Sequence, residues 1–78
     1  MARNRGGDVV IAAEMVANVM TVEVAEGDTV EVGGTVVLLE SMKMEIPVIV
    51  EVAGTVSAIK VSPGDVVQEG DVLVVLTP

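Results

Sequence analysis

A chain of 78 residues with 12 acidic and 4 basic side chains forms at most one small domain with a net charge of −8. This charge opposes binding to nucleic acid or to an anionic membrane surface, so we expect neither as a partner. Because cysteine and histidine are absent, the usual ligands of metal sites and the usual residues of triad catalysis are missing, and we expect no metal and no catalytic residue.

The first eight residues lack apolar periodicity and include two adjacent glycines, so we expect residues 1–8 to be a disordered leader and residues 9–77 to be the domain. No apolar run suits a signal peptide, and none reaches the length of a membrane helix. We therefore expect a cytoplasmic protein. We also expect a monomer.

The rest of the chain is an internal duplication. Residues 9–40 align without a gap on residues 46–77, at an offset of 37 positions. Nine of the 32 aligned pairs are identical, including Gly27 with Gly64, Asp28 with Asp65, and Glu14 with Glu51. Two copies are too few for a solenoid, so they should close on each other with pseudo-two-fold symmetry.

Each copy has the pattern of short strands separated by turns. Alternation over residues 22–24 and 59–61 and β-branched runs at 35–39 and 72–76 predict strands. The Gly27-Asp28 and Gly64-Asp65 pairs predict turns, in which the aspartates bond nearby backbone N–H groups. With no aromatic side chain to pack and no period of 3.6, an all-β barrel or sandwich of about eight strands is expected, four from each copy.

The junction between the copies is five residues long, and Lys43 is its midpoint. Pseudo-two-fold symmetry predicts a tight hairpin there, with Lys43 at its tip. A plain alternative is a surface lysine that serves solubility, with Met42 and Met44 filling the end of the barrel as flexible packing. The position between two copies favours a functional lysine.

The junction resembles the biotinyl/lipoyl attachment domain family, and most closely its small stand-alone biotin carriers. The likeness covers about residues 9–77. It rests on the Gly-Asp turns, on the step from Gly54 to Val56, and on the segment Glu40, Ser41, Met42, Lys43, Met44, Glu45. Ser41 stands where alanine is commonest in the family, and the chain has no insertion of the kind that forms a protruding thumb in some bacterial carriers.

The resemblance implies a flattened barrel of two four-stranded antiparallel sheets with Lys43 on an exposed hairpin. It implies that biotin protein ligase joins biotin to Lys43 as an amide, with Met42 and Met44 as flanking recognition residues and Glu40, Ser41 and Glu45 as the motif's surroundings. The carrier would be non-catalytic and would move a carboxyl group from biotin carboxylase to a carboxyltransferase of an acyl-CoA or related system.

Two alternatives remain open. Lipoate could be attached to the same lysine, although the family's lipoyl lysines usually follow aspartate, and Met42 therefore favours biotin. The domain could also be an unmodified β interaction module, which the lysine's position makes less favoured.

Overall fold

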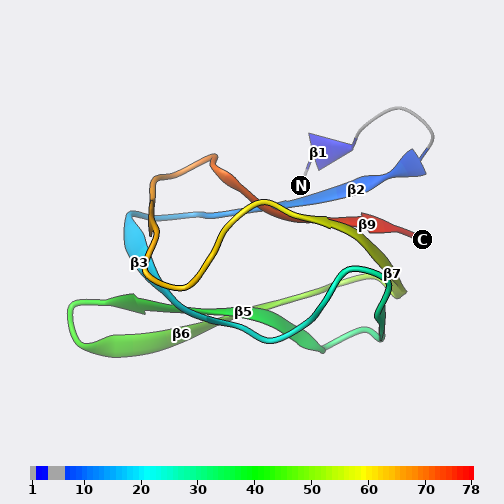
Figure 1. Cartoon of the computed structure of the whole chain (residues 1–78). Helices are drawn as coiled ribbons and strands as arrows, with labels where there is room; N and C mark the ends of the chain where they lie inside the picture. The colour runs from blue at the N-terminus through cyan, green and yellow to red at the C-terminus, as the bar shows by residue number, and fades with distance from the viewer. Residues whose placement is uncertain (1, 4–6) are drawn as a thin grey trace.

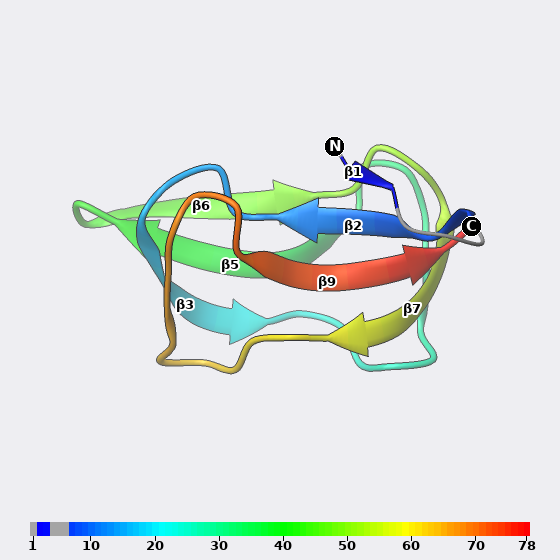
Figure 2. The same cartoon turned by 90° about the horizontal axis from the view of Figure 1, so that it is seen from above.

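The computed structural model describes residues 2–3 and 7–78, and the described residues form two antiparallel sheets that face each other (Figure 1, Figure 2). The first sheet has the order β1 (Ala2–Arg3), β2 (Val9–Ala12), β9 (Val72–Thr77), β7 (Gly54–Ile59), β4 (Thr29–Val30). The second has the order β6 (Met44–Ile49), β5 (Thr35–Ser41), β3 (Ala17–Val22), β8 (Val66–Val67). The predicted fold of two four-stranded sheets is confirmed, with the two-residue β1 added at one edge.

The duplication is reproduced in the pairing of the strands. Replacing each strand by its counterpart 37 positions away in the other copy converts the order β2, β9, β7, β4 into β6, β5, β3, β8. The register repeats as well, since Val9 pairs with Leu76 in one sheet and Ile46 with Leu39 in the other. Each sheet therefore contains strands from both copies, and the two copies interlock.

Backbone hydrogen bonds join the turns of each copy to a strand of the other. The Gly27 N–H donates to the Val56 carbonyl at 2.8 Å, and the Val56 N–H donates to the Asp28 carbonyl at 2.8 Å. The same two bonds recur with Gly64, Val19 and Asp65. Both glycines have positive φ, a conformation that costs little free energy in a residue without a Cβ.

The two equivalent aspartates of the duplication, Asp28 and Asp65, form hydrogen bonds within these turns. Carboxylate oxygens of Asp28 and Asp65 accept hydrogen bonds from the N–H groups of Ala25, at 2.9 Å, and Ser62, at 2.8 Å. These bonds to nearby backbone confirm the role predicted from the sequence.

The core lies between the sheets and is made of branched aliphatic side chains. Among the described residues no polar or charged side chain is buried. Core positions also repeat at the offset of 37, as Val36 with Leu73 and Val37 with Val74, all four fully buried. Burial of this kind is the main favourable term in folding, and here both copies contribute matching halves of it.

Two local expectations need comment. The strands predicted at residues 22–24 and 59–61 were placed too late: β3 and β7 end at Val22 and Ile59, where the chain leaves the sheet for the Gly-Asp turns. Of the predicted leader, residues 1 and 4–6 lie outside the described residues, whereas Ala2 and Arg3 pair with Val10 and Val9. Disorder over residues 1–8 stays a prediction. The described part of the chain contains no helix with the length and apolarity needed to cross a membrane.

Removing the same two methyl groups from a buried and an exposed valine tests the core. We expect Val36→Ala to lower the free energy of unfolding by about 1–3 kcal/mol, because the site is fully enclosed and leaves a cavity. Val32→Ala, at a side chain that is 67% exposed, should change it far less. Urea unfolding midpoints measure both, and equal losses would contradict this assignment of the core.

Candidate functional site

The junction forms the hairpin between β5 and β6. Ser41 pairs with Met44, so Met42 and Lys43 are the two residues of the turn. Both have positive φ, 53° and 66°, which is the backbone of a type I′ turn. Such turns match the twist of the flanking strands, but they strongly favour asparagine and glycine at the two central positions.

The backbone of Met42 and Lys43 is therefore strained, because both residues adopt a left-handed conformation without being asparagine or glycine. A side chain in the left-handed region costs on the order of 1 kcal/mol or more, and such residues cluster at functional sites. A hairpin selected only for stability would use Asn-Gly in the same place. The local sequence gives no such turn signal, and the hairpin was predicted from the duplication and from the family resemblance.

The structure confirms the predicted position of Lys43 at the tip and shows its side chain exposed. None of the side-chain hydrogen bonds of the described residues involves it. The amine is thus presented to solvent on a backbone that a two-stranded ladder holds from both sides.

The alternative in which the methionines fill the end of the barrel is wrong. Met42 is 91% exposed and Met44 is 62% exposed, so neither side chain packs into the core. Exposed large apolar side chains on both sides of a lysine form a distinctive surface, and such surfaces are typical of recognition sites.

The remaining predicted residues complete the hairpin below the tip. Glu40 pairs with Glu45 across the strands, one step below the pair of Ser41 and Met44. Like charges directly opposite each other are slightly destabilising in a sheet. The structure thus gathers all six residues of the motif at one hairpin and gives the amine an acidic border.

The tip lies far from the chain's C-terminus. The molecule measures 35 × 19 × 18 Å, and the hairpin and the C-terminus lie at opposite ends of its length (Figure 2). This follows from the symmetry, because the second copy's equivalent of the hairpin would fall after Thr77.

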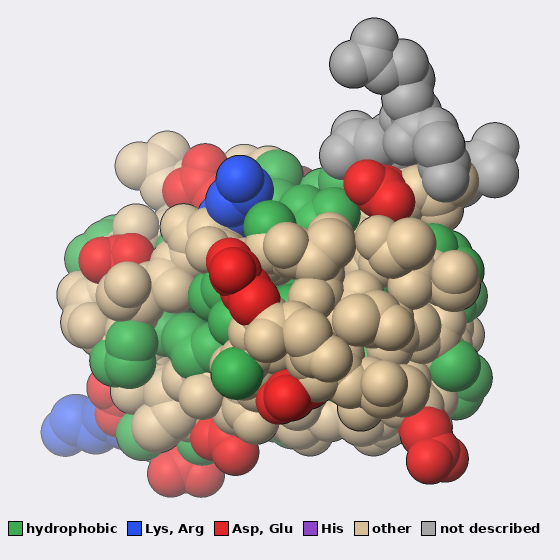
Figure 3. All heavy atoms as spheres, turned by 45° about the vertical axis from the view of Figure 1, so that its right-hand side comes forward, with side chains coloured by type: hydrophobic (Ala, Val, Ile, Leu, Met, Phe, Trp, Pro, Cys, Tyr) green, Lys and Arg blue, Asp and Glu red, His purple; other side chains and the backbone are tan. Residues whose placement is uncertain are grey.

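Acidic side chains are scattered over the face in Figure 3, with apolar side chains between them and few basic ones. Lys43 is one of only two lysines in the chain. The lysine at the tip therefore projects from a domain of strongly negative net charge.

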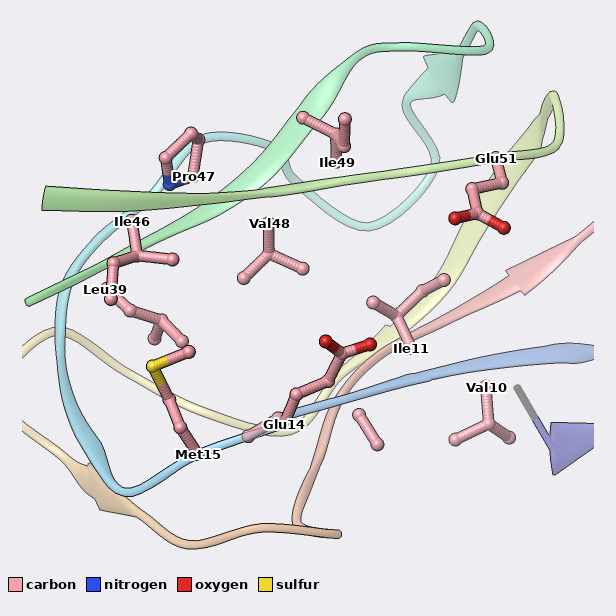
Figure 4. Close-up of a pocket in the computed structure, with 12 residues that line it drawn as sticks. Val10, Ile11, Glu14, Met15, Leu39, Ile46, Pro47, Val48, Ile49 and Glu51 are labelled. Carbon is pink, nitrogen blue, oxygen red and sulfur yellow. The ribbon is translucent and has the colours of Figure 1, made fainter.

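A second candidate site is a groove between β2 and β6, with a volume of about 520 Å³ (Figure 4). Its wall includes Ile11, Val48 and the equivalent glutamates Glu14 and Glu51. The sequence signalled it only through the identity of these glutamates in the duplication. It contains no lysine, and the predicted site residues lie outside its lining.

Comparisons with known proteins identify the family of this domain. A family model described as "Biotin-requiring enzyme" matches residues 7–76. The biotinylated protein TB7.3 of Mycobacterium tuberculosis is 62% identical over 39 residues, which are 50% of this chain and 55% of that protein. The biotin/lipoyl attachment protein of Bacillus subtilis is 46% identical over 39 residues, which are 50% of this chain and 53% of that protein. The matches thus span about half the length of these curated relatives.

Solved structures share the whole fold. A single-chain, multi-domain long-chain acyl-CoA carboxylase matches with a TM-score of 0.88 and 31% identity, over 99% of this chain and 8% of that chain. The Kluyveromyces lactis urea carboxylase matches with a TM-score of 0.88 and 29% identity, over 97% of this chain and 7% of the other. The lipoyl domain of the Azotobacter vinelandii 2-oxoglutarate dehydrogenase complex matches with a TM-score of 0.72 and 25% identity, over 87% of this chain and 96% of that domain.

The family model covers nearly the whole domain, the two-sheet fold matches throughout, and the hairpin lysine lies where the resemblance placed it. This chain belongs to the biotin/lipoyl attachment domain family.

Proposed function

We propose that this protein is a biotin carrier, that biotin is attached to Lys43 as an amide, and that the domain itself is not a catalyst. The observation that carries the proposal is the exposed lysine on a strained two-residue turn, between two exposed methionines, in a domain of the biotin/lipoyl family. A ligase can reach this amine without unfolding any part of the domain.

In this proposal the residues of the chain hold and expose the cofactor, and they do not take part in the chemical reaction. Lysine offers a four-carbon stem, and the ladder between β5 and β6 fixes the point from which this stem extends. Biotin, when bound, supplies a ureido nitrogen that takes up and releases a carboxyl group. Tethering keeps the effective concentration of the carried group high at each partner active site.

We infer that the partners are biotin protein ligase, a biotin carboxylase and a carboxyltransferase. The structural likeness to an acyl-CoA carboxylase and a urea carboxylase supports a carboxylase system of some kind. Met42 and Met44 are proposed as recognition residues because they are the apolar surface nearest the amine, and Glu40, Ser41 and Glu45 as the border of that surface. The cytoplasmic location and the monomeric state stay predictions.

Lipoate on the same lysine is the second candidate. The likeness to a lipoyl domain over 87% of this chain supports lipoate as a candidate, because the same hairpin could present either cofactor. Met42 directly before the lysine, and the biotinylated relatives with 62% identity, support biotin as the first choice.

Replacement of each lysine tests the attachment site. When the protein is coexpressed with biotin protein ligase, we expect intact mass to show one biotin adduct, which Lys43→Arg abolishes and Lys60→Arg leaves unchanged. Lys60 is the matched control because it is the other, also exposed, lysine. A lipoyl adduct would favour the second candidate. An unmodified wild-type chain beside an active ligase would leave only the interaction module.

Truncation of the methionines tests recognition. We expect Met42→Ala or Met44→Ala to lower the rate of biotinylation or of carboxyl transfer roughly fivefold, the effect of losing about 1 kcal/mol of contact energy. The urea midpoint should stay the same, since both side chains are exposed. Val66→Ala is the control, because Val66 is similarly exposed on β8. Unchanged rates in both assays would remove the methionines from the recognition surface.

The strain in the turn gives a third test. Met42→Asn combined with Lys43→Gly installs the preferred type I′ residues, and we expect it to raise the free energy of unfolding by about 1 kcal/mol. Lys43→Arg also removes the attachment amine but keeps a side chain at φ 66°, so its stability should match the wild type. If the double variant is no more stable than Lys43→Arg in urea, the turn stores no strain.

A further inference from the structure

Methionine sulfur is the group in this chain that oxidants attack most readily. The chain has no cysteine, histidine, tyrosine or tryptophan, and it has five methionines. A two-electron oxidant such as hydrogen peroxide therefore reacts with methionine, and solvent access decides which one reacts first.

The described methionines differ widely in access. Met42 is 91% exposed and Met44 is 62% exposed, whereas Met15 is 39% exposed and Met20, in β3, is half-buried. Met15 also lies against other apolar side chains in the wall of the groove between β2 and β6 (Figure 4). Among the described methionines, the two most exposed are therefore the two that flank Lys43.

We propose that Met42 and Met44 are an oxidation site that switches off modification of Lys43. The inference rests on the proposed function, since it concerns recognition of the same hairpin. In the reaction, the thioether sulfur loses two electrons and gains one oxygen atom from the peroxide, which leaves as water. The product sulfoxide is polar and chiral where the thioether was apolar and flexible.

The switch acts on recognition and not on folding. Neither exposed sulfur contributes to the core, so its oxidation removes little of the burial that stabilises the sheets. A partner that places an apolar pocket over either methionine would instead have to accept a sulfoxide oxygen without a prepared hydrogen bond, which is costly. Methionine sulfoxide reductases, one for each epimer, would restore the original surface.

A partition experiment on the wild-type chain tests the proposal. Unmodified protein is treated with limiting hydrogen peroxide and then with biotin protein ligase for a time that modifies about half of an untreated sample, and the biotinylated fraction is captured on avidin. Cleavage after glutamate releases residues 41–45, with both tip methionines, and residues 15–23, with Met15 and Met20. The second peptide is the internal control.

We expect sulfoxide in residues 41–45 to appear first and to be roughly tenfold rarer in the biotinylated fraction than in the unmodified fraction, as for loss of one buried apolar contact. Sulfoxide in residues 15–23 should divide equally between the fractions. The urea midpoint of the oxidised protein should match that of the untreated protein, and reductase treatment should restore the rate.

Equal division of the tip sulfoxide between the two fractions would overturn the proposal, and so would earlier oxidation of residues 15–23. In Met42→Leu/Met44→Leu, the ratio of the rates with and without peroxide should be close to one, and a fall in that ratio would assign the effect to other residues. Failure of the untreated wild-type chain to accept biotin would count against the proposed function itself. In that case the order of oxidation still tests the accessibility of the tip.

Discussion

The structure depends on reciprocal backbone hydrogen bonds between the two copies of the duplication. The turn at Gly27 and Asp28 bonds to Val56 of the second copy, and the turn at Gly64 and Asp65 bonds to Val19 of the first. Neither copy can satisfy its own buried backbone groups alone, and an unpaired buried N–H or C=O is costly. The copies must therefore fold together in one register, with strands of both in each sheet.

This interlocking determines what the junction can be. The chain must pass from the end of β5 to the start of β6 within two residues, because Ser41 and Met44 are already paired. A right-twisted hairpin of this length requires positive φ at both turn positions. Met42 and Lys43 meet that requirement at a cost, so the ladder and the core hold a lysine and a methionine in a conformation that they rarely adopt. The rigid ladder between β5 and β6 and the exposed turn at Met42 and Lys43 thus both result from the short connection between the two copies.

The sequence predicted those parts that repetition and turn chemistry determine. The offset of 37 residues and the turn residues implied an all-β barrel or sandwich, the Gly-Asp turns and the tip position of Lys43, and the family resemblance implied the two four-stranded sheets. Strand ends were harder, because residues 22–24 alternate like a strand although the chain already leaves the sheet at Val22. The groove between β2 and β6 was also not foreseen. It depends on how strand edges meet across two sheets, which a linear pattern does not record.

The composition of the chain and the position of the site reflect two separate roles, that of the core and that of the hairpin. A carrier needs a stable base and one reachable amine, and a core of branched aliphatics supplies the base without any aromatic, histidine or cysteine. The same composition leaves methionine as the readily oxidised residue. The recognition role that we propose for Met42 and Met44 requires that both side chains be exposed. A side chain that a partner can find is also one that peroxide can reach. In our two proposals, recognition and sensitivity to oxidation both follow from the exposure of these methionines, and burying them for protection would remove the proposed recognition surface beside the lysine.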